Sequence, residues 1–239
     1  MTVPGSDSPR SAAALKGARD TIPMIVGAIP FGLIFGTLAA QGPLAAWQGQ
    51  TMSASVFAGS AQFIALGLVA SHTGLLVIWM TTFVVNLRHM LYAATLLPAV
   101  AALPLRWRLG LGFLLTDETF AVVAARRQLA PDDRQLHWYF LGSGVAMYVS
   151  WNSVTLAGLV FGSAFPQLQS LGLEYAIVAT FVALIVPQLN RLPHLAAALA
   201  AGLLAYLWQD MPYRLGLLAA VGVGVAVGLA LSRLRRRAA

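Results

Sequence analysis

Very few charged residues are available to cover the surface of this chain, and that scarcity limits what it can fold into. Of its 239 residues, 10% are charged and 59% are hydrophobic. A soluble domain carries roughly 25% charged residues, because its surface must be hydrated. This chain cannot cover such a surface, so lipid must be the solvent for most of it. We therefore predict an all-α, polytopic transmembrane helical bundle.

Eight stretches are apolar enough to cross a bilayer as helices, which requires about 20 mostly apolar residues each. They are residues 21–41, 51–71, 74–98, 108–126, 138–162, 174–190, 193–209 and 213–232. Asn190, Arg191 and Pro193 interrupt the two shortest stretches. The alternatives are therefore seven spans, or a different number of spans because one segment is re-entrant.

The spans are predicted to form a single transmembrane transporter domain, 21–232, with candidate halves 21–126 and 138–232. A polar cytoplasmic N-terminus, 1–20, precedes this domain, and a basic cytoplasmic tail, 233–239, follows it. The N-terminus has no apolar region before a cleavage site, so the first span is expected to stay as a helix.

A weak internal repeat supports the division into halves with interrupted helices. The matching glycines are Gly32 and Gly36 with Gly158 and Gly162. Gln62 and Gln188 are 126 positions apart, the same separation as Gly32 and Gly158, and each glutamine follows a local disruption of its helix. Interrupted segments at corresponding positions of two halves are typical of a transporter's midplane site. Glycines four apart also permit close helix packing in lipid, either within the bundle or against a partner subunit.

Basic residues cluster at both ends of the chain and in one hydrophilic loop. They are Arg10, Lys16, Arg19, Arg126, Arg127, Arg134, Arg233, Arg235, Arg236 and Arg237. Such residues stay in the cytoplasm, so both termini are predicted there, which requires an even number of spans. Arg106 and Arg108 conflict with eight spans, which would place them outside, and a re-entrant segment would remove the conflict. No aromatic residues interleave with the basic ones as a base-stacking surface requires, so nucleic acid is excluded as a partner.

Three charged residues lie where a membrane helix should carry none. Arg88 is near the middle of the third stretch, and Asp117 and Glu118 are central in the fourth. Each such ion costs about 2.5–3.5 kcal/mol on insertion scales. One interpretation is a structural lock, in which Arg88 pairs with one acid. The other acid is then free to bind and release a proton, a task that His89 can share, which predicts a proton-coupling role.

Candidate substrate-binding residues lie beside the helix disruptions. They are Pro30, Phe31, Gly32, Gly59, Ser60, Ala61, Gln62, Asn86, Tyr92, Thr116, Pro187 and Gln188. A proline inside a helix leaves backbone carbonyls without a donor, which membrane proteins tolerate where the backbone lines a cavity. The alternative is that Pro30 only kinks the first span. Small residues next to Ser60 and Gln62 can expose backbone amides to a carboxylate or carbonyls to an ammonium group.

Enzyme signatures are missing from the sequence. The four histidines have no metal-ligand spacing, and there is no P-loop or nucleophile motif, so we expect no catalytic site, metal or cofactor. Without a nucleotide site, an ion gradient is the natural energy source.

Several motifs resemble the AzlC family of bacterial branched-chain amino acid transporters. They are Ile29-Pro30-Phe31-Gly32 with Phe35-Gly36, Phe57-Ala58-Gly59-Ser60-Ala61-Gln62-Phe63, Asn86-Leu87-Arg88-His89 with Leu91-Tyr92, Leu115-Thr116-Asp117-Glu118-Thr119-Phe120, Trp138-Tyr139-Phe140-Leu141-Gly142 and Val186-Pro187-Gln188-Leu189. The resemblance implies an exporter of leucine, isoleucine, valine and related amino acids in the bacterial cytoplasmic membrane. It also implies coupling to the proton-motive force and a small membrane partner of the AzlD type.

Two other functions are compatible with these residues. A passive channel or facilitator would follow the substrate gradient alone, and a non-transporting scaffold would only stabilise a partner subunit. A homo-oligomer also remains open.

Overall fold

The computed structural model describes residues 10–130, 133–164, 182, 186, 189–209, 211 and 215–238. The elements among them are α-helices, which confirms the predicted all-α class. Within this part of the chain, three helical segments are long and apolar enough to cross a membrane: Arg10–Gln41, Leu75–Val100 and Leu136–Ala164. The chain divides into two compact units, Met1–Phe63 with Val85–Gln169, and Ile64–Val84 with Ser170–Ala239.

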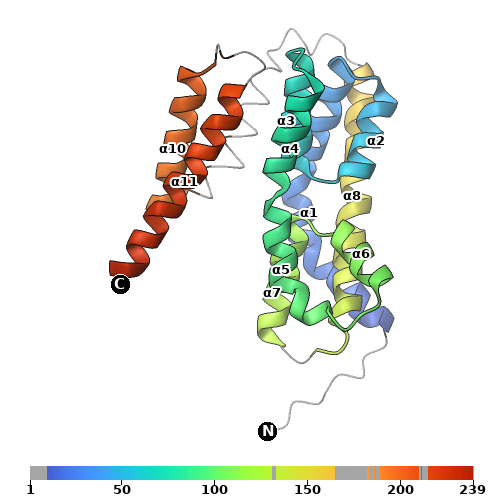
Figure 1. Cartoon of the computed structure of the whole chain (residues 1–239). Coiled ribbons are helices and arrows are strands. Elements are labelled where there is room, and N and C mark those ends of the chain that lie inside the picture. The colour runs from blue at the N-terminus through green and yellow to red at the C-terminus, as the bar shows by residue number, and fades with distance from the viewer. Residues whose placement is uncertain are drawn as a thin grey trace. The chain divides into compact units, whose positions relative to one another are not determined.

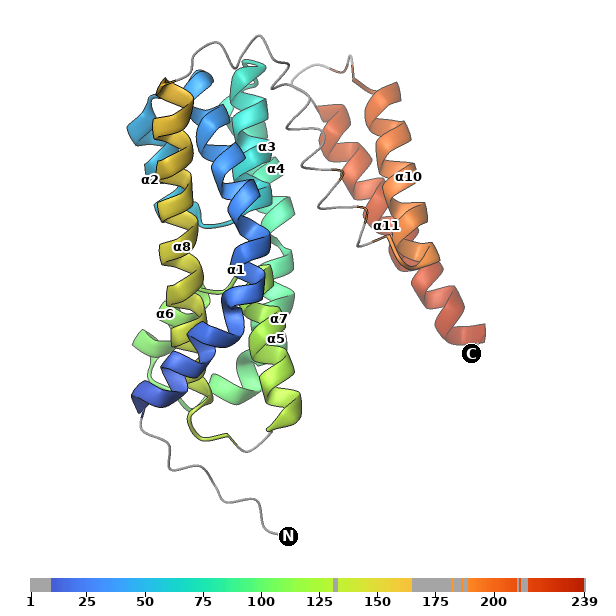
Figure 2. The same cartoon turned by 180° about the vertical axis from the view of Figure 1, so that it is seen from behind.

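The two longest helices, α1 (Arg10–Gln41) and α8 (Leu136–Ala164), form a parallel pair in the first unit. Near their starts, the hydroxyls of Thr21 and Ser143 lie 2.6 Å apart. Near their ends, the side-chain amide of Gln41 donates to the carbonyl of Gly162 at 3.2 Å. Figure 2 shows the pair side by side, and the shorter helices of this unit are arranged around it.

Small residues allow the backbones of α1 and α8 to touch. A Cβ atom at Gly36 would collide with the carbonyl oxygen of Thr155, and one at Gly158 with that of Leu33. Thr37 Oγ1 donates to the Gly158 carbonyl at 3.2 Å. Because no hydrophobic force joins helices in lipid, such close packing and interhelical hydrogen bonds stabilise the pair. The predicted glycine spacings of these helices therefore serve contacts within the bundle.

Two helical hairpins pack against α8 (Figure 1). Each hairpin starts at a different end of α8, and its chain turns back about halfway along α8. The first consists of α2 (Ala46–Val56) and the start of α3 (Gly59–Ala70), whose residues up to Phe63 belong to the first unit; the two helices are separated by Phe57 and Ala58. The second consists of α6 (Leu105–Phe113) and α7 (Asp117–Leu129), and residues 114–116 separate the two helices.

Contacts along α8 fix the direction of the first hairpin. A Cβ atom at Gly49 would lie 3.2 Å from Leu159, and farther along α2 the Tyr148 hydroxyl donates to the carbonyl of Ala54 at 2.9 Å. α2 is therefore antiparallel to α8. The chain then reverses direction between α2 and α3. Near the start of α3, Phe63 packs edge-on against Phe35 of α1 with ring centroids 5.6 Å apart.

The second hairpin comes from the other end of α8. Trp107, near the start of α6, packs against Trp138 with ring centroids 4.8 Å apart. Leu114, just past the end of α6, packs against Gly144 of α8. α6 is therefore parallel to α8, and α7 returns to the end from which α6 came, where Arg126 pairs with Asp133 at 2.7 Å.

Two predicted spans are wrong as continuous helices, because 51–71 and 108–126 each contain one of these reversals. Phe57 ends α2 in the left-handed region, with φ 45° and ψ 43°, a conformation that stops a right-handed helix. Thr116 starts α7 with an extended backbone and a side chain that accepts from the Thr119 N–H. The re-entrant alternative describes this part of the chain.

The predicted span 74–98 consists of two consecutive helices, α4 (Leu75–Asn86) and α5 (Arg88–Val100), interrupted at Leu87. The break lies beside the charged Arg88. Interrupted helices in membrane proteins are expected near polar sites.

The two hairpins form an inverted repeat that the sequence analysis missed. Phe35 packs against Phe63, and in the second hairpin Tyr92 stacks on Phe120 with ring centroids 4.5 Å apart. Both residues of the pair are shifted by 57 positions (92 − 35 and 120 − 63). α5 runs opposite to α1 and α6 runs opposite to α2, so the second copy is turned over relative to the first.

In the second unit, α10 (Leu192–Leu207) and α11 (Leu215–Ala238) form an antiparallel hairpin. They correspond to the predicted spans 193–209 and 213–232. A Cβ atom at Gly224 would lie 2.7 Å from the Ala201 Cβ, so small residues again set the spacing. The predicted span 174–190 lies outside the described residues, apart from isolated positions.

In the first unit, basic residues gather at the end where α1 and α8 begin. They are Arg10, Arg106, Arg108, Arg126, Arg127 and Arg134. Arg10 lies over the ring of Trp138, with its guanidinium carbon 5.8 Å from the centroid, and α6 begins beside the same ring. Because α6 starts at this end, Arg106 and Arg108 no longer conflict with the rule that basic residues stay in the cytoplasm.

This arrangement predicts the membrane side of three exposed positions at the ends of helices. The chain has no cysteine, so single cysteines can be introduced at Ala101, Gln128 and Gly42. A membrane-impermeant maleimide should label positions 101 and 128 from one side and position 42 from the other. If 101 and 128 were labelled from opposite sides, 108–126 would have to cross the membrane and the second re-entrant hairpin would be wrong.

Candidate functional site

The tips of the two hairpins meet halfway along the bundle. Phe57 at the first tip and Leu114 at the second belong to one buried cluster with Met147 and Trp151 of α8. The rings of Phe57 and Phe113 are 6.2 Å apart. The ends of four helices therefore converge on one level of the bundle, close to the middle of α8.

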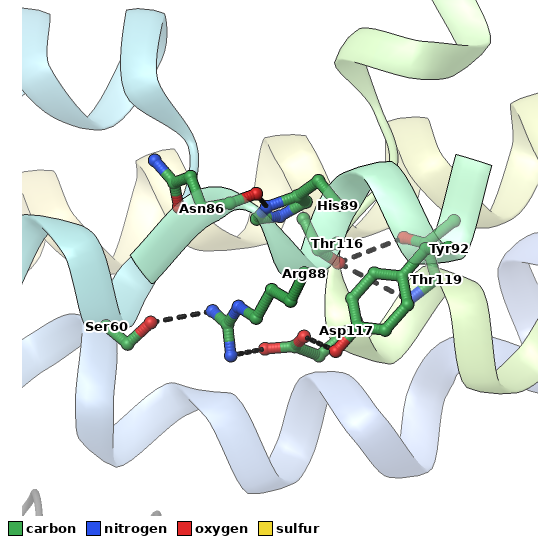
Figure 3. A network of polar contacts seen from close by, with 8 residues as sticks. All are labelled: Ser60, Asn86, Arg88, His89, Tyr92, Thr116, Asp117 and Thr119. Atoms are coloured by element: carbon green, nitrogen blue, oxygen red, sulfur yellow. Dashed lines mark hydrogen bonds and ion pairs between the residues drawn. The ribbon is translucent and has the colours of Figure 1, made fainter. Parts of the chain in front are cut away.

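An ion pair connects the tips to the start of α5 (Figure 3). Arg88 Nη1 lies 2.8 Å from Asp117 Oδ2, and Arg88 Nη2 donates to Ser60 Oγ at 2.6 Å. Tyr92 donates its hydroxyl to Asp117 Oδ1 at 2.6 Å. Arg88 thus bridges the first tip, at Ser60, to the second tip, at Asp117.

The α7 end of this network carries a second carboxylate. Thr116 Oγ1 accepts from the backbone N–H of Thr119 at 3.3 Å and lies 3.2 Å from the Thr119 hydroxyl. Glu118 interacts with the Thr116 hydroxyl and with its own backbone N–H. Two acids in the first turn of a helix are favoured by the positive end of its dipole. Only Asp117 contacts the guanidinium of Arg88.

The α3 end of the network carries an amide in place of the acids. Gln62 is completely buried, and its Oε1 accepts from Trp151 Nε1 at 3.1 Å. The Trp151 ring also lies against Gly59, where an added Cβ atom would be 3.0 Å from the ring. Trp151 therefore holds the first turn of α3 in place from α8.

Three buried polar atoms here have no hydrogen-bond partner among the described residues. They are the donors Gln62 Nε2 and Arg88 Nε and the acceptor Asn86 Oδ1. Leaving a buried donor or acceptor unpaired costs about 1–3 kcal/mol. Unpaired groups at such a cost are expected where a ligand or water completes the bonds.

The structure brings together most of the predicted site residues. Ser60, Arg88, Tyr92 and Asp117 share direct contacts, and Thr116 caps the helix that carries Asp117. Asn86, His89 and Glu118 lie within one turn of these residues along the chain. His89 packs edge-on against Tyr92, and its Nδ1 lies 3.1 Å from the Asn86 carbonyl oxygen.

None of the remaining predicted residues is bonded to the ion pair among the described residues. Phe31 packs against the cluster at the hairpin tips, and Gly32 lies against the side chains of Trp151 and Val154. Pro30 is exposed on α1. Pro187 and Gln188 lie outside the described residues. Gly59, Ala61 and Gln62 form the first turn of α3.

Sequence reasoning missed the aromatic and apolar partners from other helices. Trp151 and Phe57 contact the site directly, yet an aromatic residue in an apolar span gives no sign of its partner. Among the described residues, no group of three His, Cys, Asp or Glu side chains is placed to hold a metal ion.

These features define a class, an integral membrane protein in which broken helices surround a polar centre, as in membrane transport proteins. Residues 23–165 match the family described as AzlC protein. The chain belongs to the AzlC family and has a role in membrane transport.

Similar proteins come from several organisms. "Inner membrane protein YgaZ" of Escherichia coli (strain K12) is 26% identical over 77% of this chain and 76% of its own. An "Uncharacterized membrane protein" of Archaeoglobus fulgidus is 31% identical over 82% of this chain and 84% of its own. "Branched-chain amino acid transport protein AzlC" of Bacillus subtilis is 24% identical over 77% and 71%. No solved structure matches the chain.

Proposed function

We propose that this protein exports branched-chain amino acids (leucine, isoleucine and valine) through the site between the two hairpin tips, driven by a proton gradient. The observation that carries this proposal is the polar network of Ser60, Arg88 and Asp117, together with Gln62, at the level where the half-length helices end. Polar groups are costly at this depth of a membrane protein and mark transport pathways there.

The surroundings of the network suit an apolar side chain. Phe31, Phe57, Leu114 and Met147 form an apolar cluster at the tips. A ligand with two charged groups and a small aliphatic chain would match a polar network beside such a cluster. The printed name of the Bacillus subtilis relative supports the same class of substrate.

Proton coupling is assigned to the acids at the start of α7, with His89 as an alternative carrier. Asp117 is neutralised by Arg88 at 2.8 Å. Glu118 forms no salt bridge among the described residues, so it is the better candidate to bind and release a proton during transport.

Glu118→Gln should abolish the effect of an imposed pH gradient on leucine efflux, because an amide cannot carry a proton. Leucine–leucine exchange should continue at saturating leucine, since it needs no net proton movement. The measurement is radiolabelled leucine flux in proteoliposomes with and without a pH difference. Asp20→Asn is the matched control, because Asp20 accepts from the Tyr139 hydroxyl at the end of the bundle and an amide oxygen can still do so.

The alternatives give different results in the same assay. A passive channel predicts wild-type efflux that ignores the pH difference. If Asp117→Asn and Glu118→Gln both leave gradient-driven efflux intact, neither acid relays protons. A scaffold predicts no leucine flux, together with tight co-purification of a small membrane protein.

Orientation and partner belong to the same proposal. The basic end of the first unit is assigned to the cytoplasm, which supports a position in the bacterial inner membrane. A small membrane subunit of the AzlD type is proposed to act with this chain, and its co-purification with the tagged protein is the test.

A further inference from the structure

The two hairpin tips are related by the inverted repeat but carry opposite chemistry. With the shift of 57 positions, Ser60 corresponds to Asp117 and Gln62 to Thr119. The first turn of α7 therefore carries two acids, while the equivalent turn of α3 carries none. Both turns point the positive end of a helix dipole at the centre of the bundle.

At the α7 tip, the positive helix end is already satisfied. Thr116 accepts from the Thr119 N–H, and the carboxylates of Asp117 and Glu118 add negative charge. Arg88 balances only one of the two acids directly. When Glu118 is deprotonated, this tip therefore keeps one carboxylate beyond the one that Arg88 pairs, which favours a cation.

At the α3 tip, donors face the centre without acceptors. Along this helix the first backbone hydrogen bond closes at Gln62, whose N–H donates to the Ala58 carbonyl at 2.9 Å, so the preceding N–H groups of Gly59, Ser60 and Ala61 have no acceptor among the described residues. Gln62 Nε2 is a further unpaired donor on a fully buried side chain.

Arg88 adds positive charge to the α3 tip. Its Nη2 is bonded to Ser60 and its Nε is buried without a partner. The charge of Arg88 is paired with Asp117, but its Nε and the first N–H groups of α3 remain donors without acceptors, and a carboxylate is the anion that such donors recognise.

We infer that the site binds an α-amino acid in one orientation, with its carboxylate at the α3 tip and its ammonium group at the α7 tip. This inference rests on the proposed function and adds the roles of the two ends. Gln62 Nε2 and the free N–H groups of α3 bind the carboxylate, and Glu118 with Asp117 binds the ammonium group. A substrate that lacks either charge leaves one tip unpaired.

The test uses the purified full chain in nanodiscs and three ligands of similar shape: leucine, leucinamide and 4-methylpentanoate. Leucinamide lacks the carboxylate charge, and 4-methylpentanoate lacks the ammonium group. Calorimetry should show leucine binding, with each analogue at least about a hundredfold weaker, because a site built for hydrogen bonds rejects ligands that leave its groups unpaired.

Gln62→Glu at pH 8 tests the assignment of the ends. The variant keeps an oxygen acceptor for Trp151 but puts a negative charge where the substrate carboxylate should lie. Leucine should bind at least about tenfold more weakly to it, through like-charge repulsion. Leucinamide should bind equally well or better. Gln48→Glu is the control, because Gln48 is exposed on α2 and its Oε1 accepts from the Ala45 N–H at 2.8 Å, which a carboxylate can also do.

Each result has a distinct meaning. If leucine and both analogues bind within about threefold of one another, the two-ended recognition is wrong and the proposed function stands. If Gln62→Glu binds leucine like Gln48→Glu, the carboxylate does not lie at the α3 tip. If leucine neither binds nor moves, the proposed function fails, and this inference fails with it.

Discussion

Exchanging Arg88 for glutamine should abolish transport and lower the stability of the fold. The change leaves Asp117 with the Tyr92 hydroxyl but without its cation, and Ser60 loses the donor at 2.6 Å. Removing one partner of a buried ion pair costs about 3–5 kcal/mol. We expect a value below this range, because the Arg88 and Asp117 side chains are 28% and 40% exposed. Thermal unfolding in detergent and leucine flux in proteoliposomes measure the two effects.

The double variant Arg88→Gln, Asp117→Asn separates a structural lock from a transport role. With both charges removed, the uncompensated carboxylate is gone, so most of the lost stability should return. Transport should stay lost, because the substrate and the coupling proton need the charges themselves. A double variant that regained wild-type leucine flux would reduce the ion pair to a lock between α5 and α7.

The polar centre of the candidate site could be predicted from the sequence. Arg88, Asp117 and Glu118 are costly within an apolar stretch whatever the fold, so their positions along the chain already mark a polar centre. Ser60 and Gln62 were identified because small and polar residues interrupt an apolar helix there. These inferences use only local chemistry and the thickness of the membrane, so they did not depend on which helices meet.

The hairpins could not be predicted from hydropathy. Residues 51–71 form an apolar stretch of spanning length, and hydropathy does not reveal that Phe57 adopts a left-handed conformation. The inverted repeat preserves the arrangement of the helices rather than the identity of their residues: of the two aromatic pairs, Phe63 and Phe120 match but Phe35 is replaced by Tyr92. The misplaced charges of Arg106 and Arg108 were the sequence signal that 108–126 is not one continuous helix.

Partners from distant parts of the chain were also inaccessible. Arg88 was expected to choose between Asp117 and Glu118, and a helical spacing cannot decide which acid faces it. The structure pairs it with Asp117, because α7 begins at that residue and Thr116 fixes its first turn. The role of Trp151 depends on the packing of α8 against α3, which no local pattern encodes.

Gly36→Val should prevent the bundle from assembling, with a loss of at least about 3 kcal/mol. A Cβ atom at position 36 collides with the carbonyl oxygen of Thr155 on α8, and backbone atoms cannot move aside as a flexible side chain can. α1 and α8 would have to separate, which also breaks the bonds from Thr37 to Gly158 and from Thr21 to Ser143. Thermal unfolding and the yield of monodisperse protein in detergent measure the loss.

Gly27→Val is the matched control on the same helix, because nothing lies within 4 Å of a Cβ atom at Gly27. Both variants add the same apolar volume to α1, so a difference between them reports the contact with α8 alone. Both hairpins pack on α8, so separating α1 from it should also displace the tips and weaken leucine binding in any Gly36→Val protein that folds. Equal unfolding temperatures for the two variants would contradict the close parallel approach of α1 and α8, on which the position of the site depends.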